Sequence, residues 1–206
     1  MKRVQSGFTL IEIAVVLVIV SLLLGGVMKG SELLTQAKIG KISKDFDAVP
    51  VAAMNYQSRY KKLPGDDESA TGDGKRWATP LAESGNGDGK IDPSTAESGY
   101  FWAHLRLGGF IAGDVSSDEA AVAPPAHDGG GQFVVARAEG LSGVALCASE
   151  LPGKIAAAVD HQHDDGKPAS GSMRGYLNGE LATAPLAGGV YAEEEGSAVY
   201  TVCRAL

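Results

Sequence analysis

The feature that most constrains this chain is an apolar segment near its N-terminus, residues 8–28. Ile13 to Met28 form sixteen consecutive positions without a charge. Phe8 to Ile11 extend the apolar run to the ~20 residues that a bilayer core requires. Glu12 is the one interruption, and a carboxylate inside a membrane segment costs roughly 2.5–3.5 kcal/mol. We therefore expect Glu12 to have a function and a charged partner.

The charges around this segment predict its orientation. Lys2 and Arg3 are the only charges before it, and the positive-inside rule keeps them on the cytoplasmic side of the membrane. Residues 8–30 are thus predicted to span the membrane, with the remainder outside. The small residues at 24–27 make a poor signal peptidase site, and the helical pattern continues beyond them. The alternative is cleavage before the apolar segment.

The sequence GFTLIE at residues 7–12 follows a short basic leader and precedes the apolar run. This combination resembles the prepilin peptidase site of type IV pilins and type II secretion pseudopilins. The resemblance implies removal of a leader, residues 1–7, by cleavage after Gly7 and N-methylation of Phe8. It also implies that Glu12 of an incoming subunit pairs with the terminal amine of a neighbour. Two charges that are each costly in lipid attract strongly in a low dielectric, so assembly would neutralise both.

A heptad-like pattern predicts that the helix continues beyond the membrane through residues 31–62. Counting from Phe8 to Tyr60 gives a helix of about 80 Å at 1.5 Å per residue. Pro50 removes a backbone donor, which predicts a kink near residues 46–50. The apolar positions follow a 3,4,3,4,3,4 spacing that places them on one side of a helix, namely Ile39, Ile42, Phe46, Val49, Ala53, Tyr56 and Tyr60.

Residues 63–206 are predicted to form a globular head that begins at the Pro64-Gly65 turn. Helical patterns occur over 95–107 and 151–159, and residues 114–131 have the composition of a loop. β-branched, alternating segments at 132–137, 143–147 and 198–203 predict an antiparallel sheet packed on the long helix. The expected fold is α+β and pilin-like.

The loop SGNGDGKID at residues 84–92 is the candidate metal site of the head. Asn86 and Asp88 match ligand positions of an EF-hand calcium loop, and Asp92 offers a further oxygen. Ser84 and Thr95 stand where that motif has Asp and Glu, so the loop is incomplete. Major pseudopilins bind calcium in their heads, which makes calcium the expected ion. The alternative is a glycine-rich turn without a ligand. Other oxygens could come from Asp66, Asp67, Asp73 or Glu97.

Cys147 and Cys203 are the only cysteines and lie on the side predicted to be outside, where disulfides persist. We therefore expect a disulfide between them, with two buried thiols as the alternative. The resemblance implies that a bond at this place delimits a C-terminal region, as in pilins. The acidic and histidine-rich stretch 160–165 could suggest a metal site. Its residues are contiguous and precede Gly166, which favours an ordinary helix terminus.

The distribution of charge and the absence of catalytic motifs limit the classes of function that this protein can have. Residues 1–63 carry a net charge of +5 and residues 64–206 carry −12, so binding of nucleic acid by the head is not expected. The chain lacks the G-x-S-x-G, HExxH and P-loop motifs, which favours a non-enzymatic protein. A signal-anchored periplasmic enzyme is the alternative from another class.

The resemblance therefore implies a structural subunit of a type IV pilus-like filament. It implies no cofactor, and calcium is the only candidate ligand that the residues suggest. A pseudopilin or minor tip subunit of a type II secretion system is the alternative within the family. Its expected partners are other pilin subunits, prepilin peptidase, an inner-membrane assembly platform and membrane lipid. The expected location is the inner membrane, followed by a periplasmic or extracellular filament.

Overall fold

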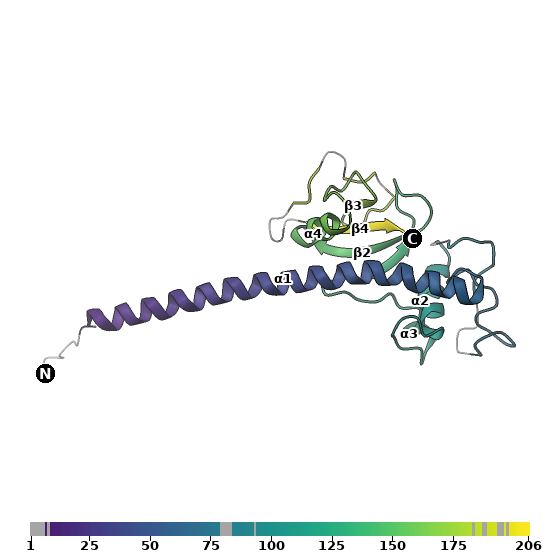
Figure 1. Cartoon of the computed structure of the whole chain (residues 1–206), viewed down its shortest axis with the longest axis horizontal. Helices are drawn as coiled ribbons and strands as arrows, with labels where there is room; N and C mark the ends of the chain where they lie inside the picture. The colour runs from purple at the N-terminus through teal and green to yellow at the C-terminus, as the bar shows by residue number, and fades with distance from the viewer. Residues whose placement is uncertain are drawn as a thin grey trace, which may run out of the picture. The chain divides into compact units, whose positions relative to one another are not determined.

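The computed structural model describes residues 7, 9–78, 84–92, 94–182, 184–186, 189–192, 196 and 198–206. Its first element is the 51-residue helix α1, Leu10–Tyr60 (Figure 1). The chain divides into two compact units, an N-terminal unit, Met1–Ala37, and a head unit, Lys38–Leu206. Each of them is described by itself below.

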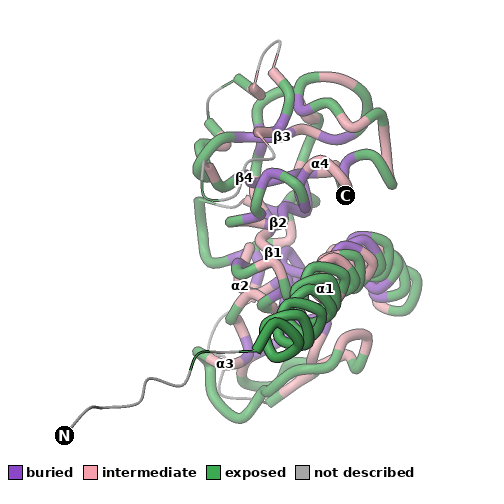
Figure 2. Tube along the Cα trace, turned by 90° about the vertical axis from the view of Figure 1, so that its left-hand side faces the viewer, coloured by how far each residue is buried: buried purple, intermediate pink, exposed green. Residues whose placement is uncertain are grey.

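The N-terminal unit consists of the apolar part of α1. An 18-residue window of this helix has a mean hydropathy of 2.8, and none of that window is buried. Figure 2 shows the same part of α1 as exposed throughout. By length and composition the helix can cross a membrane, because a bilayer core requires about 20 apolar residues.

In the head unit, one side of α1 contributes the central part of the core. Its buried positions repeat at helical spacing, as the sequence predicts, although Ala52 is more buried than Ala53. Phe46 packs edge-to-face against Phe133 of the sheet, with ring centroids 5.4 Å apart. The buried residues of α1 are Ile39, Ile42, Ser43, Phe46, Val49, Ala52 and Tyr56.

Pro50 lies inside α1, and the helix continues through it at the place where the sequence predicts a kink. Proline has no backbone N–H, so the carbonyl of Phe46 loses its normal helical donor. The Arg204 guanidinium replaces that donor, with Nη2 at 2.6 Å from the Phe46 oxygen. The same guanidinium lies 3.3 Å from the Asp47 carboxylate and 3.2 Å from Nδ1 of His163. Arg204 thus joins the last strand to α1 at its defect.

The sheet has four antiparallel strands in the order β1-β2-β4-β3. They are β1, Phe133–Ala136, β2, Ala145–Pro152, β3, Met173–Leu177, and β4, Val199–Ala205. The three predicted strands are present, and β3 is additional. Its sequence, MRGYL, has a charge and a glycine in the middle, so no β-branched pattern signals it.

Three short helices complete the head unit: α2, Glu97–Leu107, α3, Asp118–Val122, and α4, Gly153–His163. The sequence predicts α2 and α4, but α3 lies in a stretch whose composition predicts a loop. Residues of α1, α2, α4 and the sheet share one hydrophobic core. A smaller cluster around Tyr176 and the two cysteines covers other parts of the sheet. The α+β, pilin-like fold is confirmed.

Candidate functional site

The first candidate site is the start of α1, where Thr9 and Glu12 form a reciprocal cap. The Thr9 backbone N–H donates to the Glu12 carboxylate at 2.8 Å, and the Glu12 N–H donates to Thr9 Oγ1 at 3.3 Å. The Thr9 hydroxyl also donates to Glu12 Oε2 at 2.7 Å. This is a capping box, in which an N-cap Thr and a Glu three residues later satisfy helix amides that would otherwise lack partners. The cap places the only charge of the apolar segment at the first turn.

The residues around this cap are the predicted processing site. Gly7 is exposed, and a side chain added there would meet nothing within 4 Å. Phe8 and the leader before Gly7 lie outside the described residues. The T-x-x-E spacing at Thr9 and Glu12 is visible in the sequence, so the role of Thr9 as a cap could have been predicted.

The second candidate site is the acidic loop 84–92, and its backbone amides point toward a buried carboxylate. Asp66 is 2% exposed, and its two oxygens accept hydrogen bonds from the N–H groups of Asp88 at 3.0 Å and Gly89 at 2.9 Å. The Asp66 carbonyl also accepts from Gly87 at 2.9 Å. A carboxylate bound by several backbone amides is a stable arrangement because each bond is charge-assisted.

A second carboxylate holds the two ends of the same loop. Glu97 is 4% exposed, and it accepts from the N–H groups of Asn86 at 3.2 Å and Asp92 at 2.8 Å. Asp66 and Glu97 therefore act as anchors of the loop. The sequence indicates Asp66 and Glu97 only as further candidate calcium ligands, because the burial of a side chain cannot be read from the sequence.

The three predicted calcium ligands have local hydrogen-bond partners of their own. Asn86 Oδ1 accepts from the Asp88 N–H at 2.8 Å, and Asp88 Oδ1 accepts from the Lys90 N–H at 2.9 Å. Asp92 accepts from the backbone and hydroxyl of Ser94, and these bonds lower the pKa of Asp92. These hydrogen bonds close turns within the loop. Calcium binding by this loop stays a prediction.

The last turn of α4 and the residues after it hold the one group of three metal-ligating side chains found in the described part of the chain. Oxygens of Asp160, Asp164 and Asp165 lie within 4.8 Å of one another. The Tyr191 hydroxyl donates to buried Asp160 at 2.6 Å, and burial raises the pKa of this carboxyl. Asp164 accepts from the Met173 N–H at 2.8 Å. These bonds close the end of α4.

The two cysteines occupy directly opposed positions on β2 and β4. Cys147 and Cys203 form a disulfide with Cα atoms 4.0 Å apart, and both residues are buried. The bond closes a separation of 56 residues, which corresponds to roughly 4 kcal/mol in the chain-entropy model. It encloses α4 and β3, so the C-terminal part of the head is covalently fastened to the sheet.

The comparisons with known proteins concern the first site. A family model described as the prokaryotic N-terminal methylation motif matches residues 2–28. This motif is the signature of type IV pilins and pseudopilins. No curated protein and no solved structure matches the chain. The chain thus carries a pilin-type processing motif on an apolar helix, followed by a disulfide-bonded α+β head. Its N-terminal segment is similar to that of type IV pilins and pseudopilins, and its apolar helix fits anchorage in a membrane.

Proposed function

We propose that the protein is a structural subunit of a type IV pilus-like filament. The observation that carries the proposal is the methylation motif over residues 2–28 at the start of a helix whose apolar window is fully uncovered. In this proposal prepilin peptidase cleaves after Gly7 and methylates Phe8. Subunits then leave the inner membrane and assemble through packing of their apolar helices, in a periplasmic or extracellular fibre.

In the proposed assembly step, Glu12 exchanges its partners. Within the described part of one chain, its carboxylate accepts from Thr9. The new amine of a neighbouring Phe8 supplies a positive charge, which the Thr9 donors lack. Opposite charges in a low-dielectric environment attract far more strongly than in water. Assembly is favoured because it removes two uncompensated charges from lipid.

Glu12→Gln tests this step because glutamine preserves the cap acceptor while removing the charge. We expect the variant to be cleaved and membrane-inserted, and to form no filaments. Glu32→Gln is the matched control, since Glu32 lies on the same helix and accepts from Gln36 at 3.0 Å. We expect this control to assemble normally. Mass spectrometry of the product and electron microscopy of sheared fibres provide the two readouts.

Two results would contradict the proposal. One is a mature protein whose first residue is not Phe8. The other is a Glu12→Gln variant that assembles like the wild type. A signal-anchored enzyme would keep its activity when the Glu12 charge is removed. The same variant therefore distinguishes a filament subunit from an anchored enzyme.

A pseudopilin or minor tip subunit of a type II secretion system is the second candidate. The head beyond residue 63 is large compared with the helix that carries it, which suits a tip position. Immunogold labelling of sheared filaments distinguishes the two. Uniform decoration identifies the main subunit, and decoration confined to the ends identifies a tip subunit.

Calcium binding by the loop 84–92 is a separate proposal. Asn86 and Asp88 are on the surface part of the loop and offer oxygens to an ion that enters from solvent. Calorimetric titration of the purified protein with calcium tests it, with Asp88→Asn as the variant expected to lose the heat of binding. Equal heats from both proteins would overturn the proposal.

A further inference from the structure

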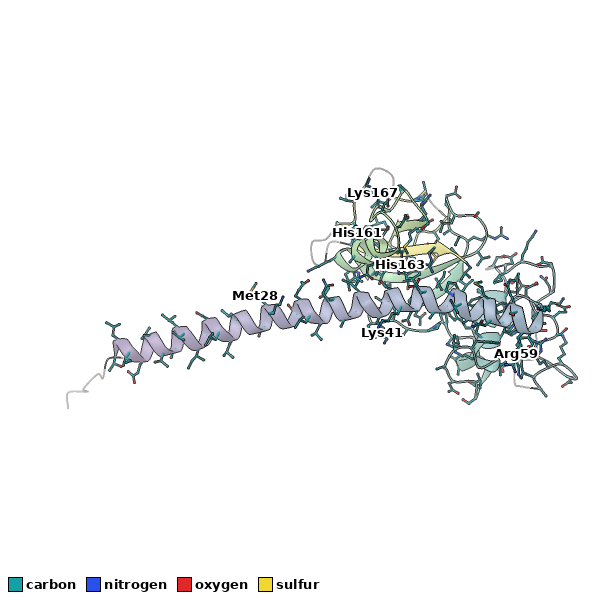
Figure 3. All side chains as sticks on the ribbon, in the orientation of Figure 1. Met28, Lys41, Arg59, His161, His163 and Lys167 are labelled. Atoms are coloured by element: carbon teal, nitrogen blue, oxygen red, sulfur yellow. A yellow bond between two sulfur atoms is a disulfide. The ribbon has the colours of Figure 1, made fainter. Side chains whose placement is uncertain are left out.

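The head unit has a hollow of about 360 Å³ where β2, β4 and the turn after β3 meet. This volume lies at the lower end of the range of ligand pockets, which suits a ligand about as large as a single sugar ring. Figure 1 labels the three strands, and Figure 3 draws their side chains. The lining residues with polar side chains are Ser149, Glu150, Asn178 and Thr201.

Two residues that line this hollow have an unusual backbone conformation. Glu150 and Asn178 have φ angles of 54° and 50°, and they are two of the three non-glycine residues with positive φ in the described chain. Glu150 lies in a β-bulge, because the pairing of β2 with β4 is interrupted between Ala148 and Leu151. Bulges and strained residues recur at ligand sites, where they direct side chains away from the regular pleat. Here they bring a carboxylate and a carboxamide to the same hollow.

Thr201 lines the same hollow with a hydroxyl group that has no partner. The residue is 2% exposed, and its side chain makes no hydrogen bond to any other described residue. A Cβ added at Gly179 would lie 3.7 Å from Thr201 Oγ1, so this oxygen faces the part of the hollow beside Gly179. A hydroxyl can donate one hydrogen bond and accept two, and leaving a buried one unused is costly. This buried and unpartnered group points to a ligand.

Glu150 gives the hollow a negative charge. Its carboxylate makes no ion pair within the described part of the chain, and no described residue that lines the hollow is basic. The Ser149 hydroxyl is already bonded to the backbone of Gln132, so Asn178 and Thr201 offer the free neutral groups. The hollow therefore combines one uncompensated carboxylate with two groups that can both donate and accept hydrogen bonds.

We propose that this hollow binds a small ligand with a primary ammonium group next to hydroxyl groups, which is the chemistry of an amino sugar. The ammonium group donates a charge-assisted hydrogen bond to the Glu150 carboxylate. The hydroxyl groups bond to the Asn178 carboxamide and the Thr201 hydroxyl. A neutral sugar leaves Glu150 without a counter-charge, and a simple alkylamine leaves Thr201 without a partner, so both bind more weakly. This inference does not depend on the proposed filament function.

Titration of the isotope-labelled full chain with glucosamine, followed by NMR, tests the site. The chain is held in a polyoxyethylene detergent, which contains neither sugar nor amine. We expect saturable shifts at the amides of residues 150, 178, 179 and 201, with a dissociation constant of about 1 mM. N-acetylglucosamine lacks the ammonium charge and butylamine lacks the hydroxyl groups, so each should bind at least ~10-fold more weakly. Absence of saturable shifts with glucosamine, or equal binding of either comparison ligand, would overturn the proposal.

Glu150→Gln tests the carboxylate, because it keeps the size of the side chain and removes its charge. We expect glucosamine to bind this variant at least ~10-fold more weakly. Glu119→Gln is the matched control, since Glu119 is an exposed carboxylate on α3 and does not line the hollow. The control should keep the affinity of the natural chain. An unchanged dissociation constant in Glu150→Gln would contradict the assignment of the ammonium site.

Thr201→Val tests the buried hydroxyl, because valine has nearly the same shape. The variant should keep its melting temperature, since no hydrogen bond within the described chain is lost, and should bind glucosamine at least ~10-fold more weakly. Thr201→Ser retains a hydroxyl and should restore the affinity. A Thr201→Val variant that binds glucosamine like the natural chain would show that the hydroxyl does not contact the ligand and would overturn the proposed site.

Discussion

Buried carboxylates organise the acidic loop of the head. Asp66 and Glu97 are almost fully buried, and each accepts two backbone N–H groups of residues 86–92. Burial of a charge is costly unless hydrogen bonds replace the lost water. Here the glycine-rich loop supplies them, because Gly87 and Gly89 adopt positive φ angles that let the chain turn its amides inward. The loop and the two carboxylates therefore depend on each other.

This arrangement predicts unequal effects for two conservative substitutions. Asp66→Asn should destabilise the head by about 1–3 kcal/mol, because one N–H of the loop loses its charged acceptor. Asp88→Asn should stay within about 0.5 kcal/mol, because its side-chain amide oxygen can still accept from the Lys90 N–H at the surface. Urea unfolding in the presence of EDTA measures both. Equal effects would show that the buried anchor has no special role.

His104 is a buried titratable group with one satisfied nitrogen. Its Nδ1 accepts from the Gly65 N–H at 2.9 Å, while Nε2 has no hydrogen-bond partner among the described residues. Its ring stacks on Tyr56, with centroids 6.0 Å apart. Burial lowers the pKa of His104 from 6.5 to about 4, the nearby Asp67 carboxylate opposing the shift. Protonation in the folded state would both break the Gly65 bond and bury a charge.

The sign of the pH dependence follows from this pKa. Between pH 6.5 and about 4 the unfolded chain binds a proton that folded His104 does not bind. Stability from this group is therefore complete above pH 6.5 and declines toward pH 4, by roughly 3 kcal/mol in total. His104→Asn should flatten the slope of unfolding free energy against pH, whatever its effect on absolute stability. His161→Asn, at an exposed site on α4, should leave the slope unchanged. An unaltered slope in His104→Asn would contradict the assignment.

At the scale of elements, α1 depends on a residue from the other end of the chain. Pro50 leaves the Phe46 carbonyl without a helical donor, and Arg204 of β4 supplies one at 2.6 Å. The interaction couples the continuity of a helix to the position of a strand. An arginine suits this role because its planar guanidinium can also reach Asp47 and His163.

A double-mutant cycle isolates this coupling. Arg204→Met should cost about 1–3 kcal/mol in the natural chain, since a carbonyl loses its donor. In a Pro50→Ala background the restored backbone N–H at position 50 bonds to the Phe46 carbonyl, so the same change should cost clearly less. The contacts of Arg204 with Asp47 and His163 are lost in both backgrounds and cancel in the cycle. Urea unfolding of the four proteins gives the interaction energy, and strict additivity would show that Arg204 does not serve the Pro50 defect.

Sequence patterns predict the elements whose apolar spacing is regular. The helical spacing from Ile39 to Tyr56 and the β-branched strands are visible because one face of each is buried. The helix α3 is missed because five residues show no period, and β3 because Gly175 interrupts it. At the N-terminus, Glu12 is recognisable from its isolation in an apolar run. The anchoring role of Asp66 cannot be recognised from the sequence, because its hydrogen-bond partners lie more than 20 residues away in the chain.

At the scale of the whole molecule, the two units share one helix but not one core. The first buried residue of α1 is Ile39, and all buried core residues in the described chain lie at or beyond it. A variant that begins at Ser31 should therefore fold with a melting temperature within about 2 °C of that of the full chain in detergent, and should not bind lipid vesicles. Circular dichroism and vesicle flotation check the two outcomes. A large fall in melting temperature would mean that the apolar segment contributes to the stability of the head.

The buried face of α1 in the head core has a mechanical consequence in the proposed filament. Within the head unit, a force directed along the axis of α1 acts parallel to a row of buried contacts from Ile39 to Tyr56. A load in this direction shears those contacts together rather than peeling them apart one by one. Resistance to pulling therefore comes from the whole row at once, and the bond between Cys147 and Cys203 limits how far the chain behind it can be drawn out.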